Sequence, residues 1–191
     1  MSIYKEEDAI DFLFSAPANT VNIVSLGYLS RYIKTIHDPA DTFYMNGSMG
    51  LCLPFGIGIS MCARKRVQCI IGDGSFIMNL QSLLMLKSCS SKPGNLVIIV
   101  IDNQCHNSTG QQNTYSEKLE FRSLSEAFGI TFFQAGSNGE LGKSLYHAGV
   151  SGAPALIHVT VAPMRLAPLR ITQSLPEIKQ AFLKNSSTWI I

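Results

Sequence analysis

Short apolar runs rich in β-branched residues recur along this chain, and segments with helical character separate them. The runs lie at residues 21–25, 43–46, 67–71, 96–101, 130–135 and 155–161. Apolar residues at consecutive rather than alternate positions are typical of strands that are buried on both faces. Strands that alternate with helices form parallel sheets with helices on both sides. The sequence therefore predicts an α/β fold of three layers, α/β/α, around a mostly parallel sheet of about six strands.

The segments between the runs carry helix signals. They lie at residues 6–15, 29–37, 50–63, 76–90, 123–128, 141–149 and 176–183. In the fourth, Ile77, Leu80 and Leu84 recur at helical spacing, and Ser75 stands at the position of an N-terminal cap. We expect one continuous helix over residues 76–90.

One domain accounts for the whole chain, residues 1–191. No repeat, low-complexity tract or linker divides it. The polar stretch 104–121 is long for a connection, and loops of that length are often functional. The tail at 185–191 is expected to be peripheral, although its apolar end, Trp189-Ile190-Ile191, could dock on something.

Composition and charge exclude several classes of protein. The formal net charge is +2 without a basic run, so nucleic acid is not an expected partner. Five cysteines, an odd number without a C-x-x-C pair, predict neither a disulfide framework nor a structural zinc site. The N-terminus lacks the apolar core of a signal peptide, and every apolar stretch is too short to span a bilayer. We expect a cytoplasmic protein without a membrane anchor, whose 46% hydrophobic content leaves room for a surface that a partner covers.

The chemistry is concentrated in Gly72-Asp73-Gly74-Ser75, which follows one apolar run and precedes a helix-like segment. Glycines there allow a sharp turn and the close approach of an anion. A helix N-terminus offers free N–H groups to a phosphate. An acid beside phosphates would repel them unless a cation lies between, and Mg²⁺ takes oxygen ligands that it shares with phosphates. The motif therefore predicts a site for a polyphosphate and Mg²⁺.

A second magnesium ligand is expected at the end of the next strand. Asp102-Asn103 follows the run 96–101, and neighbouring parallel strands end at the same edge of a sheet. Asn103 offers an amide oxygen there, and the backbone carbonyl of Cys105 offers a third oxygen as the chain turns.

The glycine motif has other possible meanings. A dinucleotide-binding fingerprint requires a third glycine where this chain has Ile77, so that match is incomplete. The chain has no phosphate-binding loop of the form G-x-x-x-x-G-K-[ST]. Gly-Asp-Gly alone can be only a tight turn, but Asn103 at the end of the next run favours the ligand site.

Taken together, these motifs resemble the diphosphate-binding domain of thiamine diphosphate enzymes, in particular of sulfopyruvate and phosphonopyruvate decarboxylases. The resemblance extends over most of the chain, whose length is similar to that of a separate β subunit. It is carried by Gly72-Asp73-Gly74-Ser75, Gly27-Tyr28-Leu29-Ser30-Arg31, Phe43-Tyr44-Met45-Asn46-Gly47-Ser48-Met49-Gly50, Asp102-Asn103-Gln104-Cys105-His106-Asn107-Ser108-Thr109-Gly110-Gln111-Gln112-Asn113-Thr114 and Pro176-Glu177-Ile178-Lys179.

The resemblance implies a site for thiamine diphosphate and Mg²⁺ with specific ligands. Asp73 and Asn103 would hold Mg²⁺ by their side chains, and Cys105 by its carbonyl. Gly47 would accept a hydrogen bond from the 4′-amino group of the cofactor, and Met49 would keep the cofactor bent. The whole cofactor-binding set comprises Gly47, Ser48, Met49, Gly72, Asp73, Gly74, Ser75, Asn103 and Cys105. Without the resemblance, the turn that contains Gly47 and Met49 is a strand-to-helix connection with a core methionine.

His106 is the candidate catalytic side chain, since it directly follows the predicted metal ligands in the long polar loop. It would donate a proton or bind an anionic substrate group. The alternative is a solvated loop histidine. His37, His147 and His158 lie in predicted helices or strands and are interpreted as structural.

The chain departs from the family pattern at five positions in or near the site, namely Asn46, Cys105, Asn107, Gln111 and Asn113. A carbonyl ligand does not depend on its side chain, so the change at Cys105 leaves the metal site intact. The other changes bear on loop shape and on the choice of substrate.

The resemblance also implies that part of the active site is supplied by a second domain. Enzymes of this kind place the cofactor between two domains, and a pyrimidine-binding domain supplies the glutamate that activates it. No pyrimidine domain is found on this chain, so we expect a partner subunit and a hetero-oligomer. The expected reaction is decarboxylation of a 2-keto acid with an anionic head, 3-sulfopyruvate or 3-phosphonopyruvate. The alternatives are another thiamine diphosphate reaction, such as carboligation or 2-keto acid oxidation, and a non-catalytic module that binds the cofactor.

Overall fold

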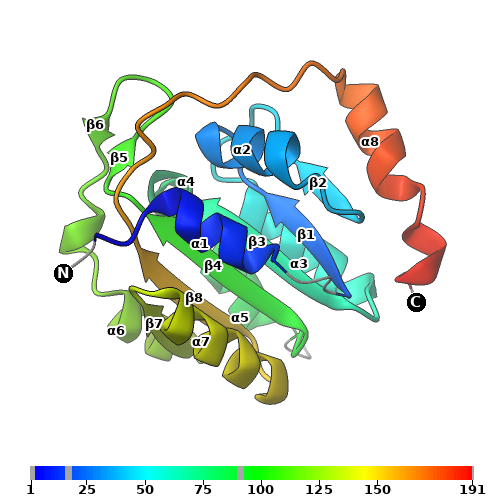
Figure 1. The fold of residues 1–191 in the computed structure, drawn as a ribbon. Coiled ribbons are helices and arrows are strands. Elements are labelled where there is room, and N and C mark those ends of the chain that lie inside the picture. The colour runs from blue at the N-terminus through cyan, green and yellow to red at the C-terminus, as the bar shows by residue number, and fades with distance from the viewer. Residues whose placement is uncertain (1–2, 16–18, 90–92, 191) are drawn as a thin grey trace.

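Parallel strands form the centre of the molecule. The computed structural model describes residues 3–15, 19–89 and 93–190, and within them six strands pair in the order β2-β1-β3-β4-β8-β7, every neighbouring pair parallel. They are β1 (Thr20–Val24), β2 (Thr42–Tyr44), β3 (Arg66–Gly72), β4 (Leu96–Asp102), β7 (Thr131–Ala135) and β8 (Ala155–Thr160). The predicted sheet and the α/β fold class are confirmed (Figure 1).

Helices cover both faces of this sheet (Figure 1). They are α1 (Glu6–Leu13), α2 (Tyr28–Ile36), α3 (Cys52–Cys62), α4 (Asp73–Met78), α5 (Ser82–Ser88), α6 (Phe121–Phe128), α7 (Asn138–Val150) and α8 (Leu175–Leu183). Apolar residues of α3, α4, α5 and α6 belong to one core cluster, and those of α1, α2 and α7 to the other. Helix α8 lies beside the edge strand β2 and contributes Phe182 to the first cluster and Ile178 to the second.

The central strand β4 shows why the runs are continuously apolar. All seven of its residues are buried. Ile98 packs in the cluster beneath α3 and α5, whereas its neighbour Ile99 packs in the cluster beneath α1 and α7. Because side chains alternate between the faces of a strand, a sheet covered on both sides needs apolar residues at every position.

The helix predicted at 76–90 is wrong as a single element, and its residue 90 lies outside the described residues. The structure has α4 and α5 instead, with a break at Asn79 (φ −135°, ψ 52°). The Asn79 Nδ2 donates to the Gly50 carbonyl at 3.0 Å, and this contact with a distant turn holds the break. Leu84, expected in the core, is 60% exposed, because the break rotates α5 so that Leu83 is buried instead. Helix α4 begins at Asp73 with Gly72 as its N-cap, so the predicted cap at Ser75 is also wrong.

The polar stretch 104–121 has more structure than a plain loop. It holds a short antiparallel hairpin of β5 (Cys105–His106) and β6 (Gln112–Asn113), followed by the 3-10 helix η1 (Ser116–Lys118). The hairpin stands at the carboxyl end of β4, beside the predicted site (Figure 1).

The C-terminal tail was expected to be peripheral, and this is wrong, because Trp189 packs in the core of the domain. The Trp189 side chain is 1% exposed, with its ring 5.2 Å from that of Phe182. Its carbonyl accepts from the Arg64 N–H at 2.7 Å, and Ile190 bridges to Ala63. The last residue, 191, lies outside the described residues.

The strand order reverses at the centre of the sheet. The chain runs from β1 outward to the edge strand β2 and then returns to β3 on the other side of β1. In open parallel sheets, ligands bind beyond the carboxyl ends of the strands where the order reverses. The loops after β1 and β3 diverge at this point, which is where the Gly72–Ser75 motif stands. None of the described helices is long and apolar enough to cross a membrane.

Candidate functional site

The glycine motif joins β3 to α4 and is fixed from both sides. The Gly72 N–H donates to the Ser25 hydroxyl at 3.1 Å, which ties the motif to the end of β1. The Gly50 N–H donates to the Ser75 hydroxyl oxygen at 3.1 Å. Because Ser75 accepts that bond, its own O–H proton remains available for an anion, as its predicted role requires.

Asp73 is a buried carboxylate, 2% exposed, and it forms no ion pair with any residue in the described ranges. Burial raises its pKa, and the nearby Asp102 carboxylate adds to that effect. Hydrogen bonds from the Thr114 hydroxyl and the Gly74 N–H act in the opposite direction. A carboxylate in this position is stabilised in its charged form by a cation.

Asn103 follows β4 and lies at the same edge of the sheet. In the register of β3 and β4, Gly72 is opposite Ile101, so Asp73 and the Asp102-Asn103 pair emerge side by side. The Asn103 Oδ1 accepts from the Cys105 N–H at 3.1 Å, which keeps that oxygen on the Cys105 side. The Cys105 carbonyl accepts from the Asn107 N–H at 3.0 Å and retains a second lone pair. The three predicted metal ligands therefore come from neighbouring elements at one edge.

Glu6, which sequence reasoning missed, belongs to this site. It lies at the start of α1 and is 2% exposed. Its Oε2 accepts from the Asn103 Nδ2 at 2.9 Å and from the Met164 N–H at 3.2 Å. Burial raises its pKa, and these two hydrogen bonds oppose the shift. The sequence gives no signal for it, because an acid in the first turn of an acidic helix is normally solvated.

These groups surround a cavity of about 110 Å³. Its wall contains Glu6, Leu26, Gly27, Tyr28, Leu29, Met49, Gly72, Asp73, Gly74, Ser75, Asn103, Cys105, His106, Asn107, Ser108 and Thr109. Two of these are buried carboxylates, and none is a lysine or arginine. An oxygen-rich wall with excess negative charge fits a hard divalent cation such as Mg²⁺.

The donor set also argues against a soft transition metal. No group of three or more His, Cys, Asp and Glu residues in the described part of the chain is placed to hold a metal ion. The predicted set is of another kind, since it combines one carboxylate, one amide oxygen and one backbone carbonyl. Such all-oxygen ligands suit Mg²⁺ that shares its coordination with phosphates.

Asp102, next to Asn103 in the chain, is buried and hydrogen-bonded by residues outside the cavity wall. His158 approaches its Oδ2 at 2.7 Å, and the Ser116 hydroxyl donates to its Oδ1 at 2.7 Å. Burial alone would raise the pKa of Asp102, but these partners outweigh burial and lower it. The His158 ring also stacks on Phe121 with 4.0 Å between centroids. The contacts of Asp102 with His158 and Ser116 thus fix the chain immediately before Asn103. This agrees with the interpretation of His158 as a structural residue.

His106 lies in β5 and forms part of the cavity wall. Its ring packs against Gly74, where an added Cβ would lie 2.4 Å from the imidazole Cε1. A side chain at position 74 would therefore force the His106 ring to move away from the cavity wall as it stands. The catalytic role of His106 stays a prediction.

The three predicted cofactor residues in the turn after β2, Gly47, Ser48 and Met49, do not all face the same cavity. Gly47 (φ 80°) and Ser48 (φ 53°) both adopt left-handed backbone conformations, and both are exposed. Met49 reaches the wall of the Asp73 cavity. Gly47 instead lines a second cavity of about 440 Å³ that adjoins the first. The structure thus brings together all predicted cofactor residues except Gly47, which faces the neighbouring cavity, and Ser48, which is exposed on the turn between them.

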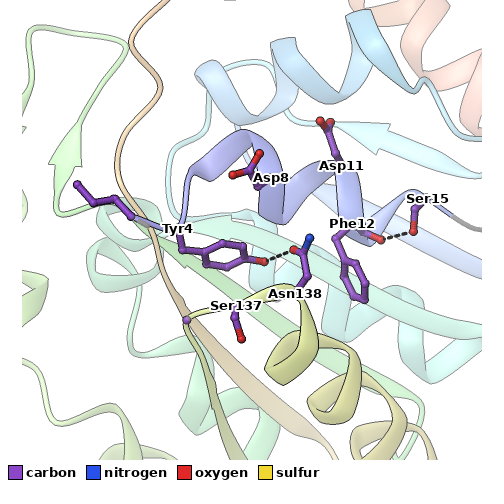
Figure 2. A pocket seen from close by; sticks show the side chains of 9 residues that line it. Tyr4, Asp8, Asp11, Phe12, Ser15, Ser137 and Asn138 are labelled. Atoms are coloured by element: carbon purple, nitrogen blue, oxygen red, sulfur yellow. Dashed lines mark hydrogen bonds between the residues drawn. The ribbon is translucent and has the colours of Figure 1, made fainter. Parts of the chain in front are cut away.

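A larger hollow lies away from these residues, between α1 and the start of α7. It has a volume of about 500 Å³, and the Tyr4 hydroxyl donates across it to the Asn138 Oδ1 at 2.7 Å (Figure 2). Its acid Asp11 already accepts from the Tyr32 hydroxyl and pairs with His37. The hollow is a crevice between two helices and contains none of the predicted site residues.

Comparison with known proteins places these residues in a family. Residues 25–159 match the family described as "Thiamine pyrophosphate enzyme, C-terminal TPP binding domain". The sulfopyruvate decarboxylase subunit beta of Methanothermobacter thermautotrophicus is 31% identical over 93% of this chain and 92% of its own length. The phosphonopyruvate decarboxylase of Streptomyces hygroscopicus is 34% identical over 82% of this chain, which spans only 39% of that longer enzyme.

Solved structures support the fold. The thiamine diphosphate-dependent 4-hydroxybenzoylformate decarboxylase of Rhodococcus jostii RHA1 superposes with a TM-score of 0.73 at 17% identity, over 87% of this chain and 34% of that one. At that identity the likeness concerns the fold alone. The matched family model includes the Gly72–Ser75 motif, Asn103 and the turn at Gly47, around which the cavities are built. This chain therefore belongs to the thiamine pyrophosphate enzymes and carries their C-terminal TPP-binding domain.

Proposed function

We propose that this chain is the cofactor-binding subunit of a two-subunit enzyme that decarboxylates a 2-keto acid with an anionic head, using thiamine diphosphate and Mg²⁺. The observation that carries the proposal is the cavity in which buried Asp73 and Glu6 line the wall with Asn103 and Ser75, and in which no lysine or arginine balances the two carboxylates. The similarity to a sulfopyruvate decarboxylase subunit over nearly its whole length supports the choice of reaction.

Each residue of the site has a task in this proposal. Asp73, Asn103 and the Cys105 carbonyl hold Mg²⁺, and Ser75 donates its hydroxyl proton to the diphosphate. The bound cofactor supplies an electron sink for the electron pair that departing CO₂ leaves behind. His106 stands over Gly74 at the cavity wall, where it holds an anionic group or delivers a proton.

The glutamate that activates the cofactor is assigned to a partner subunit. Among the described residues, the elements from α1 to α8 include the sheet and the helices that cover it, and we interpret them as one diphosphate-binding domain. Leu51 is 48% exposed and Met78 is 60% exposed, and both stand beside Gly50, whose N–H donates to Ser75 of the site. Exposed apolar side chains at this place are typical of a surface that another subunit covers.

The test uses the chain reconstituted with a pyrimidine-domain subunit. Asp73→Ala is expected to abolish Mg²⁺-dependent binding of thiamine diphosphate in calorimetric titration, because it removes the one carboxylate of the ligand set. Asp8→Ala, an exposed acid on α1, is the matched control and keeps wild-type affinity. Unchanged affinity in Asp73→Ala would refute the metal assignment.

Turnover separates the proposed reaction from its alternatives. The reconstituted complex is expected to release CO₂ from 3-sulfopyruvate or 3-phosphonopyruvate faster than from pyruvate, and the isolated chain to release none. Cofactor binding without CO₂ release from any of the three would favour a non-catalytic module or a different thiamine diphosphate reaction. Appreciable release by the isolated chain would refute the two-subunit arrangement.

A further inference from the structure

The second cavity contains two arginines and no acid. Its volume is about 440 Å³, and its wall consists of Leu26, Gly27, Ser30, Arg31, Met45, Asn46, Gly47, Ser108, Thr109, Arg170 and Ile171. Within the described residues, neither guanidinium forms a hydrogen bond or an ion pair, and Arg31 only lies 5.5 Å from the Tyr28 ring. Arg31 is half-buried and Arg170 is exposed, and a concave wall that presents both cations and no acid has a positive potential that attracts an anion.

The arginines come from separate parts of the fold. Arg31 lies in α2, and Arg170 lies in the extended segment between β8 and α8, which passes the β5–β6 hairpin and crosses above α2 (Figure 1). That segment is anchored at its start, where the Met164 N–H donates to Glu6 and the Met164 carbonyl accepts from the Asn107 Nδ2 at 2.9 Å. Next to Arg170, Ile171 packs against the core cluster that α1 and α2 share, so the segment is held both before and after the arginine.

The arginine cavity and the Asp73 cavity share a wall. Leu26, Gly27, Ser108 and Thr109 line both. The groups assigned to the diphosphate lie in the first cavity, and the Gly47 carbonyl assigned to the other end of the cofactor lies in the second. The residues that would hold the two ends of the cofactor therefore lie on either side of the shared wall, and a substrate that reacts with the cofactor would bind beside that wall. The arginine cavity is then where the substrate extends beyond its keto carbon.

The chemistry decides which part of the substrate the arginines bind. Guanidinium groups bind oxyanions through two parallel hydrogen bonds. The carboxylate that leaves as CO₂ loses its charge in the transition state, so pairing it with arginine would stabilise the ground state more and slow the reaction. A sulfonate or phosphonate on carbon 3 keeps its charge throughout, so pairing it with arginine does not raise the barrier.

We infer that Arg31 and Arg170 form the subsite that binds the tetrahedral anionic head of the 2-keto acid. This inference rests on the proposed function, and it assigns the substrate selectivity of the enzyme to these two residues. These arginines are specificity-determining residues. Neither is needed to hold the diphosphate, which lies with Mg²⁺ in the acid-lined cavity next to them.

Selectivity in the reconstituted complex tests the assignment. Arg31→Gln and Arg170→Gln are each expected to lower the ratio of kcat/KM for 3-sulfopyruvate to that for pyruvate by about 10- to 100-fold, the loss of one charge-assisted contact. The same ratio for 3-phosphonopyruvate shows which head the subsite prefers. Arg165→Gln is the matched control, since Arg165 is exposed in the same segment and lies outside the cavity wall. It is expected to keep the wild-type ratio.

Three results would overturn the inference. An unchanged ratio in both variants would show that the arginines do not contact the head. An equal fall for 3-sulfopyruvate and pyruvate would place them on the shared carboxylate instead. A fall in affinity for thiamine diphosphate, measured by calorimetry, would assign them to the cofactor.

A binding measurement keeps the inference separate from the proposed reaction. The probe is 3-sulfopropanoate, which carries the head but no keto group, and propanoate is its counterpart without the head. The wild-type complex with Mg²⁺ and cofactor is expected to bind 3-sulfopropanoate more tightly than propanoate, and both variants are expected to lose this preference. If wild-type complex decarboxylates none of the three acids, the proposed function fails while this titration still decides the arginine subsite. An unchanged preference in both variants would refute the subsite.

Discussion

Replacing Glu6 by alanine should weaken magnesium binding and destabilise the fold at the same time. The Glu6 carboxylate is 2% exposed and accepts from the Asn103 Nδ2 at 2.9 Å and the Met164 N–H at 3.2 Å. Each buried donor left without its acceptor costs about 1–3 kcal/mol. Asn103 is only half buried and regains part of its loss from water, so we expect a destabilisation of about 2–4 kcal/mol. Freed from Glu6, the Asn103 amide can rotate, and loss of such an orienting partner typically costs about 10- to 100-fold in metal affinity.

Glu6→Gln separates the two effects. The glutamine oxygen can still accept from Asn103 and from Met164, so the fold should keep most of its stability. The negative charge that faces the metal site is lost, so magnesium affinity should fall, but less than in Glu6→Ala. Asp8→Ala is the control, because Asp8 lies in the same helical turn and is exposed.

The assay combines urea denaturation of the purified chain with calorimetric titration of thiamine diphosphate into the reconstituted complex over a range of Mg²⁺ concentrations. The expected order of magnesium affinity is Asp8→Ala, equal to wild type, then Glu6→Gln, then Glu6→Ala. If Glu6→Ala unfolds more easily yet binds Mg²⁺ as wild type does, Glu6 supports only the fold. If Asp8→Ala loses as much affinity as Glu6→Gln, the effect is one of general charge rather than of the Asn103 contact.

Two further predictions concern the fold. Gly56→Ala should destabilise the protein by about 1–3 kcal/mol in urea denaturation, because the new Cβ would lie 1.9 Å from the buried Cys69 Sγ. In the control Gly58→Ala, the new Cβ meets nothing within 4 Å, so the change should be neutral or stabilising by up to about 1 kcal/mol. Adding Cys69→Ala should relieve the defect of Gly56→Ala. Equal stability of Gly56→Ala and Gly58→Ala would contradict the close packing. Burial, and then the Asp38 carboxylate, raise the pKa of Tyr44, so its contribution to stability is complete below pH 10 and is lost as the pH rises above the ordinary tyrosine value. Tyr44→Phe should therefore flatten the alkaline decline of the free energy of unfolding, and an unchanged slope would show that Tyr44 does not titrate in this range.

The sheet could be predicted because its signal is local. The inner strands of this sheet are largely buried on both faces, and β4 is buried at every position, so its run 96–101 is apolar throughout. The neighbouring positions of Asp73 and Asn103, the proposed metal ligands, followed from the same rule, since both stand directly after such runs on strands that pair with each other. Their proposed roles, however, depend on chemistry that no contact within the chain tests.

The features that escaped prediction depend on distant contacts. The break at Asn79 is held by the carbonyl of Gly50, which belongs to a separate turn, and the helical spacing of Ile77, Leu80 and Leu84 continues across the break regardless. Glu6 is equally invisible, because its burial results from Met164 and Asn103, both more than ninety residues away. A pattern within one segment cannot report a partner that only the folded chain brings into place.

The two cavities carry opposite charges, acids in the first and arginines in the second, and the proposed reaction explains why the charges are kept apart. Both the cofactor diphosphate and the substrate head are anions, so one shared basic cluster would bind either of them and would allow each to block the other. In the proposed reaction, the first cavity has Asp73 and Glu6 in its wall and admits phosphates only together with a divalent cation. The second has Arg31 and Arg170 and needs no cation to bind an anion. In the proposed reaction, binding of the cofactor then depends on Mg²⁺, whereas binding of the substrate head does not. Each anion is thus directed to its own cavity, the diphosphate by the metal ion and the substrate head by the two arginines.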